Sequence, residues 1–304
     1  MKDPGHRHKA PIAFFAYNRP EHTRQALETL CKCDGALESE LFIYCDGPKR
    51  AIDEKAVKQV REIVKSYNWC GAVQVVEHDV NLGLANSIIH GVTEIVNRYG
   101  RIIVLEDDLV LSPQFLNFMN DALDSYKDIQ EVMHVSGYMF PVRGKLPETF
   151  FYRATSCWGW ATWKRAWDKF EPDAIKLLAK FENAKQRWEF DIKGTMQYYE
   201  MLHEQTRNNT DAWAARWYAS VFFNNGLCLH PGISLVNNIG HDGTGLHCGP
   251  TDVYKVEVSK ERVSHFTEDI KESEQAIILM SDFYHSLNKT FFVRVFNKLK
   301  QVIG

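Results

Sequence analysis

Several features whose presence would indicate other classes of protein are missing or scarce in this sequence. No run approaches about 18 uninterrupted apolar residues, so no transmembrane helix is expected. The segment Met1 to Lys9 is polar and charged and lacks the apolar core of a signal peptide. The formal net charge of −3 provides no overall field that would recruit nucleic acid. The seven cysteines are odd in number and scattered, which favours reduced thiols, and together these absences predict a cytosolic protein.

A glycine-rich phosphate loop is also missing after the first predicted strand, residues 11–17. No Gly-x-Gly-x-x-Gly follows that strand, which argues against a dinucleotide-dependent dehydrogenase. Nucleotidyltransferases that make activated sugars usually carry a Gly-rich loop and a basic residue at the same point. This chain has Ala16-Tyr17-Asn18-Arg19-Pro20 there instead.

The first half of the sequence contains a regular alternation of strand-like and helix-like segments. Such alternation is typical of a mostly parallel sheet built from crossover units, and it predicts an α/β fold. Ser112 and Pro113 predict the start of a further helix, as its N-cap and first helical residue. The predicted strands cover residues 11–17, 41–45, 72–77 and 101–105, and the predicted helices cover residues 20–31, 52–67 and 84–98.

The second half is less regular. Residues 132–136 and 149–153 are predicted as short strands, and residues 163–170 and 212–224 as helices. The stretch 237–249 is rich in Gly, Asn and His and is predicted to be a mobile loop.

The strongest local signal is the acidic triplet Glu106-Asp107-Asp108, which directly follows the apolar strand 101–105. Three consecutive carboxylates beside a buried strand repel one another and lose solvation unless a cation or hydrogen-bond donors neutralise them. Hard divalent ions such as Mg²⁺ and Mn²⁺ prefer carboxylate oxygens and keep positions open for phosphate. Ligands of open α/β sheets also bind beyond the carboxyl ends of the strands. The pattern favours a metal site over the alternative, an ordinary solvated acidic turn.

Three further segments precede the triplet in a specific order and spacing. They are the Ala-x-x-Arg element that ends at Arg19, Asp46 at the end of the second predicted strand, and Gly83 with His90 seven residues later. Together with the triplet they resemble the GT-A glycosyltransferases, and among these the N-acetylglucosaminyltransferase that initiates complex N-glycans and its bacterial sugar-transferase relatives. The resemblance implies a Rossmann-like, mostly parallel central sheet flanked by helices.

The resemblance also implies a site for a nucleotide-sugar, and for a UDP-sugar above all. Arg19 and Asp46 would hold the uracil and nearby atoms, with Asp46 accepting a hydrogen bond from a base N–H. Gly83 would begin the helix beside the nucleotide, and His90 would lie against the nucleoside. A surface position for Arg19 and a core position for His90 are the alternative interpretations.

For the acidic triplet, the resemblance implies that Glu106 and Asp107 bind hydroxyls of the ribose or the sugar. Asp108 would be the direct ligand of Mn²⁺ or Mg²⁺. A metal in that place bridges the two phosphates and stabilises the charge that develops on the leaving diphosphate.

An inverting transferase also needs a general base near the acceptor hydroxyl. Related enzymes have an acid beside a Trp at the start of a helix, which Asp211 and Trp213 match. The family has two adjacent acids at this point and this chain has one, so a residue that merely caps the helix is the alternative. The loop that bears His241, Asp242 and His247 resembles the family's flexible closing segment, and it offers a further metal or phosphate contact or an alternative base in Asp242.

Two aromatic segments have open interpretations. Trp158, Trp160 and Trp163 suit either an acceptor platform, because indole stacks on the C–H faces of sugars, or core packing, which is at least as good for two of them. From Asn288 onward, apolar residues recur at helical spacing with Lys and Arg on the other face. Such a helix suits peripheral contact with an anionic membrane, or docking on the domain.

The resulting prediction is an inverting, metal-dependent glycosyltransferase of the bacterial cytosol, acting at the inner face of the membrane on a surface glycan or lipid-linked saccharide. Its catalytic domain is predicted over residues 1–265, with a nucleotide-sugar-binding half in 1–110 and an acceptor-binding half in 111–265. A helical tail is predicted over 266–304. A sugar nucleotidyltransferase and a non-catalytic glycan-binding protein on the same fold are the alternatives.

Overall fold

The structure, a computed structural model, describes residues 9–208, 213–244 and 249–287 of the chain. Its centre is an eight-stranded sheet in the order β3-β2-β1-β4-β8-β6-β9-β7. Within this sheet β8 and β7 run opposite to the other strands. A second sheet pairs β5 with β10 in antiparallel orientation. The predicted fold class, an α/β protein with a Rossmann-like, mostly parallel central sheet flanked by helices, is confirmed.

The elements follow one another along the chain as a βαβ alternation and then as a mixed region. The strands are β1 (Ile12–Ala16), β2 (Glu40–Cys45), β3 (Ala72–Glu77), β4 (Arg101–Glu106), β5 (Leu109–Leu111), β6 (Val132–Ser136), β7 (Thr149–Tyr152), β8 (Trp160–Trp163), β9 (Leu227–Pro231) and β10 (Val236–Asn238). The α-helices are α1 (Pro20–Cys31), α2 (Glu54–Lys65), α3 (Leu84–Tyr99), α4 (Phe115–Ser125), α5 (Lys164–Trp167), α6 (Ala174–Ala179), α7 (Ala184–Phe190), α8 (Tyr198–Asn208) and α9 (Trp213–Phe223). Two 3₁₀ turns cover Ala36–Glu38 and Ala51–Asp53.

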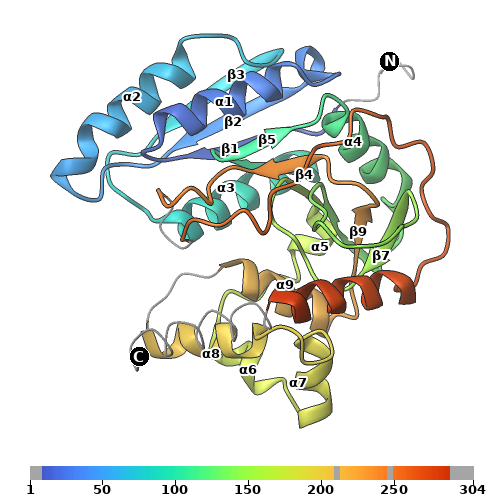
Figure 1. The fold of residues 1–304 in the computed structure, drawn as a ribbon. Helices are drawn as coiled ribbons and strands as arrows, with labels where there is room; N and C mark the ends of the chain where they lie inside the picture. The colour runs from blue at the N-terminus through green and yellow to red at the C-terminus, as the bar shows by residue number, and fades with distance from the viewer. Residues whose placement is uncertain (1–8, 209–212, 245–248, 288–304) are drawn as a thin grey trace, which may run out of the picture.

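Helices cover both faces of the central sheet, which explains why its middle strands are apolar on both sides. On one face, α1, α2 and α4 pack with Ile12 and Phe14 of β1. On the other face, α3, α5 and α9 pack with Ala13 and Phe15. Alternate residues of one strand thus enter opposite cores, as strand geometry requires. Figure 1 shows α1 and α2 on the opposite side of the sheet from α3 and α9.

A third core joins the helices α6, α7 and α8 to α9, β7 and a helix over residues 274–287. Ala276, Met280 and Tyr284 recur on one face of that last helix, and all three are buried. Figure 1 shows it lying beside α9, with α6, α7 and α8 gathered beyond. Residues 266–273 of the predicted C-terminal helical tail are thus not helical, and the helix that follows belongs to the core. The basic amphipathic stretch from Asn288 lies outside the described residues.

Two predictions about local structure need correction. The helix predicted to start at Ser112 and Pro113 begins later, at Phe115, although the Ser112 hydroxyl accepts a hydrogen bond of 3.1 Å from the N–H of Gln114, as an N-cap residue would. The helix predicted over residues 163–170 is also wrong in part, since Trp160–Trp163 forms strand β8 between β4 and β6. Trp160 and Trp163 are buried in the core, and only Trp158 of the three is partly exposed.

No helix within 9–208, 213–244 and 249–287 is long and apolar enough to span a membrane.

Candidate functional site

The ends of β1 and β4 bring Arg19 to the acidic triplet. These strands are parallel neighbours with Phe15 opposite Glu106, so the segments that follow them leave the sheet side by side. The Nη2 atom of Arg19 contacts the Asp107 carboxylate and donates to Asp108 Oδ2 at 2.9 Å. The backbone N–H of Tyr17 donates to the second Asp107 oxygen at 3.4 Å. The structure thus joins three of the predicted site residues directly.

This cluster carries more negative than positive charge. Asp107 is only 4% exposed, and burial raises its pKa although Arg19 acts in the opposite direction. Burial also raises the pKa of Glu106, and the neighbouring carboxylates of Asp108 and Asp107 add to that effect. Burial alone would lower the pKa of Arg19, but the carboxylates of Asp107 and Asp108 have the larger combined effect, so the pKa of Arg19 is raised. One guanidinium therefore faces three carboxylates, an arrangement that favours a further cation.

Asp46, at the end of the neighbouring strand β2, holds the loop that leads into α3. Its carboxylate accepts four hydrogen bonds of 2.8–3.0 Å, from the backbone N–H groups of Gly47, Leu82 and Gly83 and from the side-chain amide of Asn81. Gly83, just before α3, has φ +80°, a positive value that favours glycine. The Asp46 carboxylate thus fixes the start of α3 at the same edge of the sheet as the acidic triplet.

Replacing Asp46 by Ala leaves these backbone N–H groups without their acceptor. Because an unsatisfied buried donor costs about 1–3 kcal/mol, the free energy of unfolding in urea should fall by about that amount. Asp79→Ala, at an exposed acid in the loop after β3, is the matched control and should have little effect. A stability that does not change, together with lost nucleotide binding, would instead assign Asp46 to direct ligand contact.

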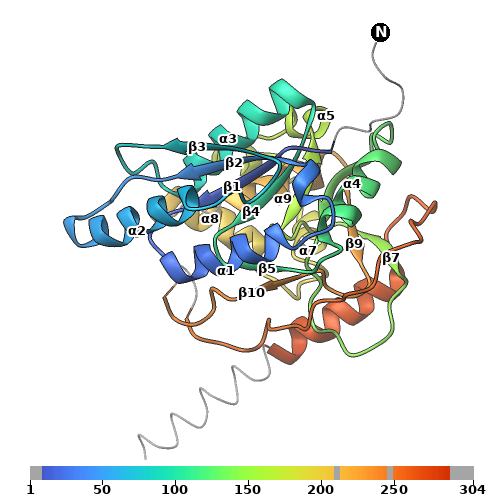
Figure 2. The ribbon, with the colours of Figure 1, turned by 90° about the horizontal axis from the view of Figure 1, so that it is seen from above.

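The loop after β10 forms the other wall of the site. β10 pairs with β5, which directly follows the triplet, and the Ile239 N–H donates to the backbone oxygen of Asp108 at 2.9 Å. A Cβ atom added to Gly240 would lie 2.2 Å from Asp108 Oδ2 and 3.0 Å from Arg19 Nη1. Figure 2 shows β5 and β10 side by side next to α1. Sequence reasoning missed Gly240, whose lack of a side chain leaves room for the Asp108 carboxylate.

His241 is the next residue, and both of its ring nitrogens are buried without a hydrogen-bond partner. Its ring contacts Trp158 and Tyr254, with centroids 5.2 and 5.1 Å apart. Burial lowers the pKa of His241, and the nearby Asp108 carboxylate acts in the opposite direction. Trp158, the one partly exposed residue of the aromatic segment, thus stands at the site. A neutral imidazole with unused nitrogens beside a carboxylate is a suitable metal ligand.

Asp242, the alternative general base, is already engaged. Its carboxylate accepts hydrogen bonds from the Thr244 backbone N–H at 2.9 Å and hydroxyl at 2.7 Å, and it contacts His22 Nε2 of α1 at 3.2 Å. The hydrogen bonds from Thr244 are the main reason why the pKa of Asp242 is lowered. Its position ties the loop after β10 to α1 and makes Asp242 a weak base.

His90 is a predicted site residue that no contact among the described residues joins to this cluster. His90 is exposed in the second turn of α3, about 10 Å along the helix from Gly83, and it lines a shallow depression with Ile89 and Thr93. The core position weighed for His90 is therefore wrong, and its contact with a nucleoside stays a prediction. Asp211, two residues before α9 begins at Trp213, lies outside the described residues.

Comparison with known proteins gives only weak similarities. No protein-family model matches the sequence, and no curated protein matches it. A UDP-glucose pyrophosphorylase complexed with UDP-glucose is similar at a TM-score of 0.37 and 11% identity, over 74% of this chain and 91% of that one. Mouse xyloside xylosyltransferase 1 in its apo form gives 0.39 and 10%, over 71% and 82%. S. aureus TarS gives 0.31 and 16%, over 45% of this chain and 23% of its own. Similarities this weak assign no activity, so the function must be argued from the site.

Proposed function

We propose that this protein is a metal-dependent glycosyltransferase that transfers a sugar from a nucleotide-sugar, most simply a UDP-sugar, to a hydroxyl of a glycan or lipid-linked saccharide. The observation that carries this proposal is the excess of buried carboxylate at the carboxyl edge of the parallel strands, where Arg19, Asp107 and Asp108 meet. A divalent cation bound there would offset the excess negative charge of the carboxylates. The same cation, together with Arg19, would match the negative charge of a bound diphosphate.

The residues present fit such a metal. Asp108 supplies a carboxylate, and His241 supplies a buried ring whose nitrogens have no hydrogen-bond partner. In the part of the chain that the structure describes, no group of three or more His, Cys, Asp or Glu side chains is assembled as a complete metal site. Mg²⁺ and Mn²⁺ in nucleotide enzymes commonly take only one or two protein ligands and complete their shell with phosphate and water. Asp108 and His241 would hold the ion, which would stabilise the leaving diphosphate.

The other site residues are assigned either to the nucleotide-sugar or to the acceptor. Arg19 pairs with Asp107 and Asp108 and is proposed to contact phosphate as well, while Asp46 holds the loop before α3 against which the nucleotide would lie. Glu106 and Asp107 are proposed to receive hydroxyls of the ribose or sugar. Asp211 is proposed as the base that deprotonates the acceptor in an inverting displacement. Trp158, partly exposed beside His241, is the proposed stacking surface for the acceptor sugar.

A methyl group at position 240 should interfere with nucleotide binding through the metal. In Gly240→Ala the added Cβ must displace the Asp108 carboxylate or Arg19, and overpacking of this kind costs about 1–3 kcal/mol. Mn²⁺-dependent binding of UDP, measured by calorimetry, should therefore weaken by about tenfold or more. Gly249→Ala, where nothing lies within 4 Å of the new Cβ, is the control. Equal affinities for the two variants would remove Gly240 from the site.

The activity itself is tested by product analysis. The protein is incubated with Mn²⁺ and a panel of UDP-, GDP- and CMP-sugars, with and without a glycan extract as acceptor. Release of the free nucleoside diphosphate from a UDP-sugar, increased by the acceptor, is the expected result. Formation of pyrophosphate would identify a nucleotidyltransferase instead, and binding without turnover under every metal would contradict an enzymatic role.

A further inference from the structure

A cavity of about 400 Å³ lies away from the acidic cluster, between β7, α7, α9 and the C-terminal helix 274–287. Tyr152 of its wall pairs with Cys228 near the start of β9, and Cys228 pairs with His134 of β6. On the other side, Val104, which lies just before Leu105 and the acidic triplet, pairs with Trp160 of β8, and Trp160 pairs with Ser136 at the end of β6. The two places therefore lie toward opposite ends of the sheet, about 10 Å or more apart along the strands.

The backbone at the rim of this cavity is held in a disfavoured conformation. Ile192, Lys193 and Gly194 follow one another with φ of 52°, 55° and 72°. Consecutive left-handed residues are rare, and a β-branched residue such as Ile192 is a genuine outlier there. Asn225, which also lines the cavity, has φ 51°. Among the described residues, the three non-glycine residues with positive φ thus all belong to this one cavity, and such outliers concentrate at functional sites.

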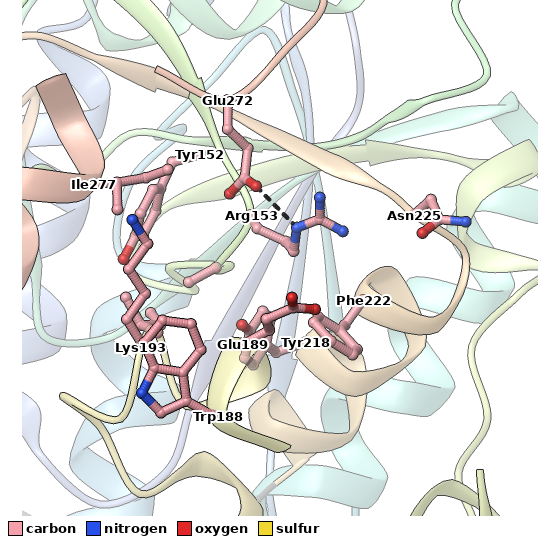
Figure 3. A pocket seen from close by; sticks show the side chains of 12 residues that line it. Tyr152, Arg153, Trp188, Glu189, Lys193, Tyr218, Phe222, Asn225, Glu272 and Ile277 are labelled. Carbon is pink, nitrogen blue, oxygen red and sulfur yellow. Dashed lines mark hydrogen bonds and ion pairs between the residues drawn. The ribbon is translucent and has the colours of Figure 1, made fainter. Parts of the chain in front are cut away.

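The left-handed turn presents an aromatic side chain to solvent. The Gly194 N–H donates to the backbone oxygen of Trp188 at 3.1 Å. A Cβ added to Gly194 would approach the Trp188 ring to 3.1 Å, so the turn packs against the edge of the indole. Trp188 nevertheless stays 49% exposed, and Figure 3 shows it beside Lys193 at one side of the cavity. A half-exposed indole fixed by its neighbours is a ready surface for an apolar ligand face.

A hydroxyl and charged side chains of both signs complete the wall of the cavity. The hydroxyl of Tyr152 is buried and has no hydrogen-bond partner, although the residue is only 2% exposed. Arg153 Nε donates to Glu272 at 3.1 Å, and Figure 3 shows Glu189 between this pair and Trp188. The two cations of the wall, Arg153 and Lys193, are balanced by the two carboxylates Glu189 and Glu272. The lining therefore offers both hydrogen-bond donors and acceptors, and its balanced charges give no net attraction for an anion.

We infer that this cavity binds a neutral sugar unit. A sugar ring has an apolar C–H face for Trp188 and hydroxyls that both donate and accept, which suits the Arg153–Glu272 pair and the free Tyr152 hydroxyl. The volume lies at the lower end of ligand pockets, of roughly 300–1,000 Å³, and admits one or two rings. The biological role of this sugar site rests on the proposed function. In a glycosyltransferase, a second saccharide site distant from the acidic cluster would hold another part of the acceptor glycan.

The inference is tested by saturation-transfer NMR on the full chain, with glucose, galactose, mannose, N-acetylglucosamine and their disaccharides as probes. At least one neutral sugar should bind saturably. Trp188→Ala should weaken that binding by about tenfold, whereas Trp188→Phe, which keeps an aromatic face, should retain most of it. Met201→Ala, at a similarly exposed apolar residue of α8, is the matched control. No saturable binding, equal binding by Trp188→Ala, or tighter binding of glucose 6-phosphate than of glucose would each overturn the inference.

A second readout separates this inference from the proposed function. Trp188→Ala should still release nucleotide from the UDP-sugar in the absence of acceptor, because the cavity lies apart from Arg19 and Asp108. Asp108→Asn should still bind the neutral sugar. Loss of sugar binding with intact nucleotide release would reject only the cavity, and sugar binding without any nucleotide release would reject only the transferase.

Discussion

Replacing Asp108 by Asn is expected to abolish turnover of the nucleotide-sugar, with a loss of at least about a thousandfold. The substitution keeps the size of the side chain but removes the charge that the metal and Arg19 both require. In the structure Asp108 Oδ2 accepts from Arg19 at 2.9 Å, and the loop with Gly240 and His241 closes directly over it. Nucleotide release from a UDP-sugar in the presence of Mn²⁺ measures the effect.

The control for this variant is Asp79→Asn, an exposed acid that also follows a strand of the parallel sheet. It should retain the wild-type rate. A rate for Asp108→Asn within a few-fold of the wild type, across a range of Mn²⁺ concentrations, would show that the acidic triplet is not the metal-binding element.

Replacing Asp211 by Asn is expected to separate binding from transfer. A general base contributes about 10²–10⁴-fold to a rate, so transfer to the acceptor should fall by that factor. Binding of the nucleotide-sugar should stay intact because the acidic cluster is unchanged. Single-turnover transfer and equilibrium binding of UDP measure the two effects separately.

Asp242→Asn is the comparison for the base, since the Asp242 carboxylate already accepts from Thr244 and contacts His22. It should reduce transfer less than Asp211→Asn does. If Asp211→Asn transfers at the wild-type rate and Asp242→Asn does not, the base has been assigned to the wrong residue.

The part of the site that lies at the ends of the predicted strands could be predicted from the sequence. The apolar runs 11–17 and 101–105 predict parallel strands of one sheet, and the residues that follow parallel strands leave the sheet at one edge. That the two strands are neighbours is seen only in the structure. The contact of Arg19 with Asp107 and Asp108 is a consequence of that register. The alternative in which Arg19 is merely a surface residue is wrong, because its side chain is largely buried against the two carboxylates.

The position of Gly240 and His241 beside Asp108 could not be predicted from strand order in this way. It depends on the pairing of β5 with β10, two three-residue strands far apart in the chain, whose short apolar runs give little signal. The role of Asp46 was also incompletely predicted, because three of the four donors that surround its carboxylate come from a loop about 35 residues later. Nothing in the local pattern of residues 188–194 predicts a left-handed turn, since Ile192 and Lys193 rarely adopt one.

The central claim is that Asp108 binds a divalent cation together with a nucleotide diphosphate. Titration of the protein with Mn²⁺, followed by the electron paramagnetic resonance of the free ion, tests it directly in the presence and absence of UDP. We predict that UDP and the wild-type protein together remove about one Mn²⁺ per chain from solution, more tightly than UDP alone. Asp108→Asn should lose this binding, and His241→Ala should weaken it. Binding of Mn²⁺ and UDP by Asp108→Asn with wild-type affinity would contradict the account.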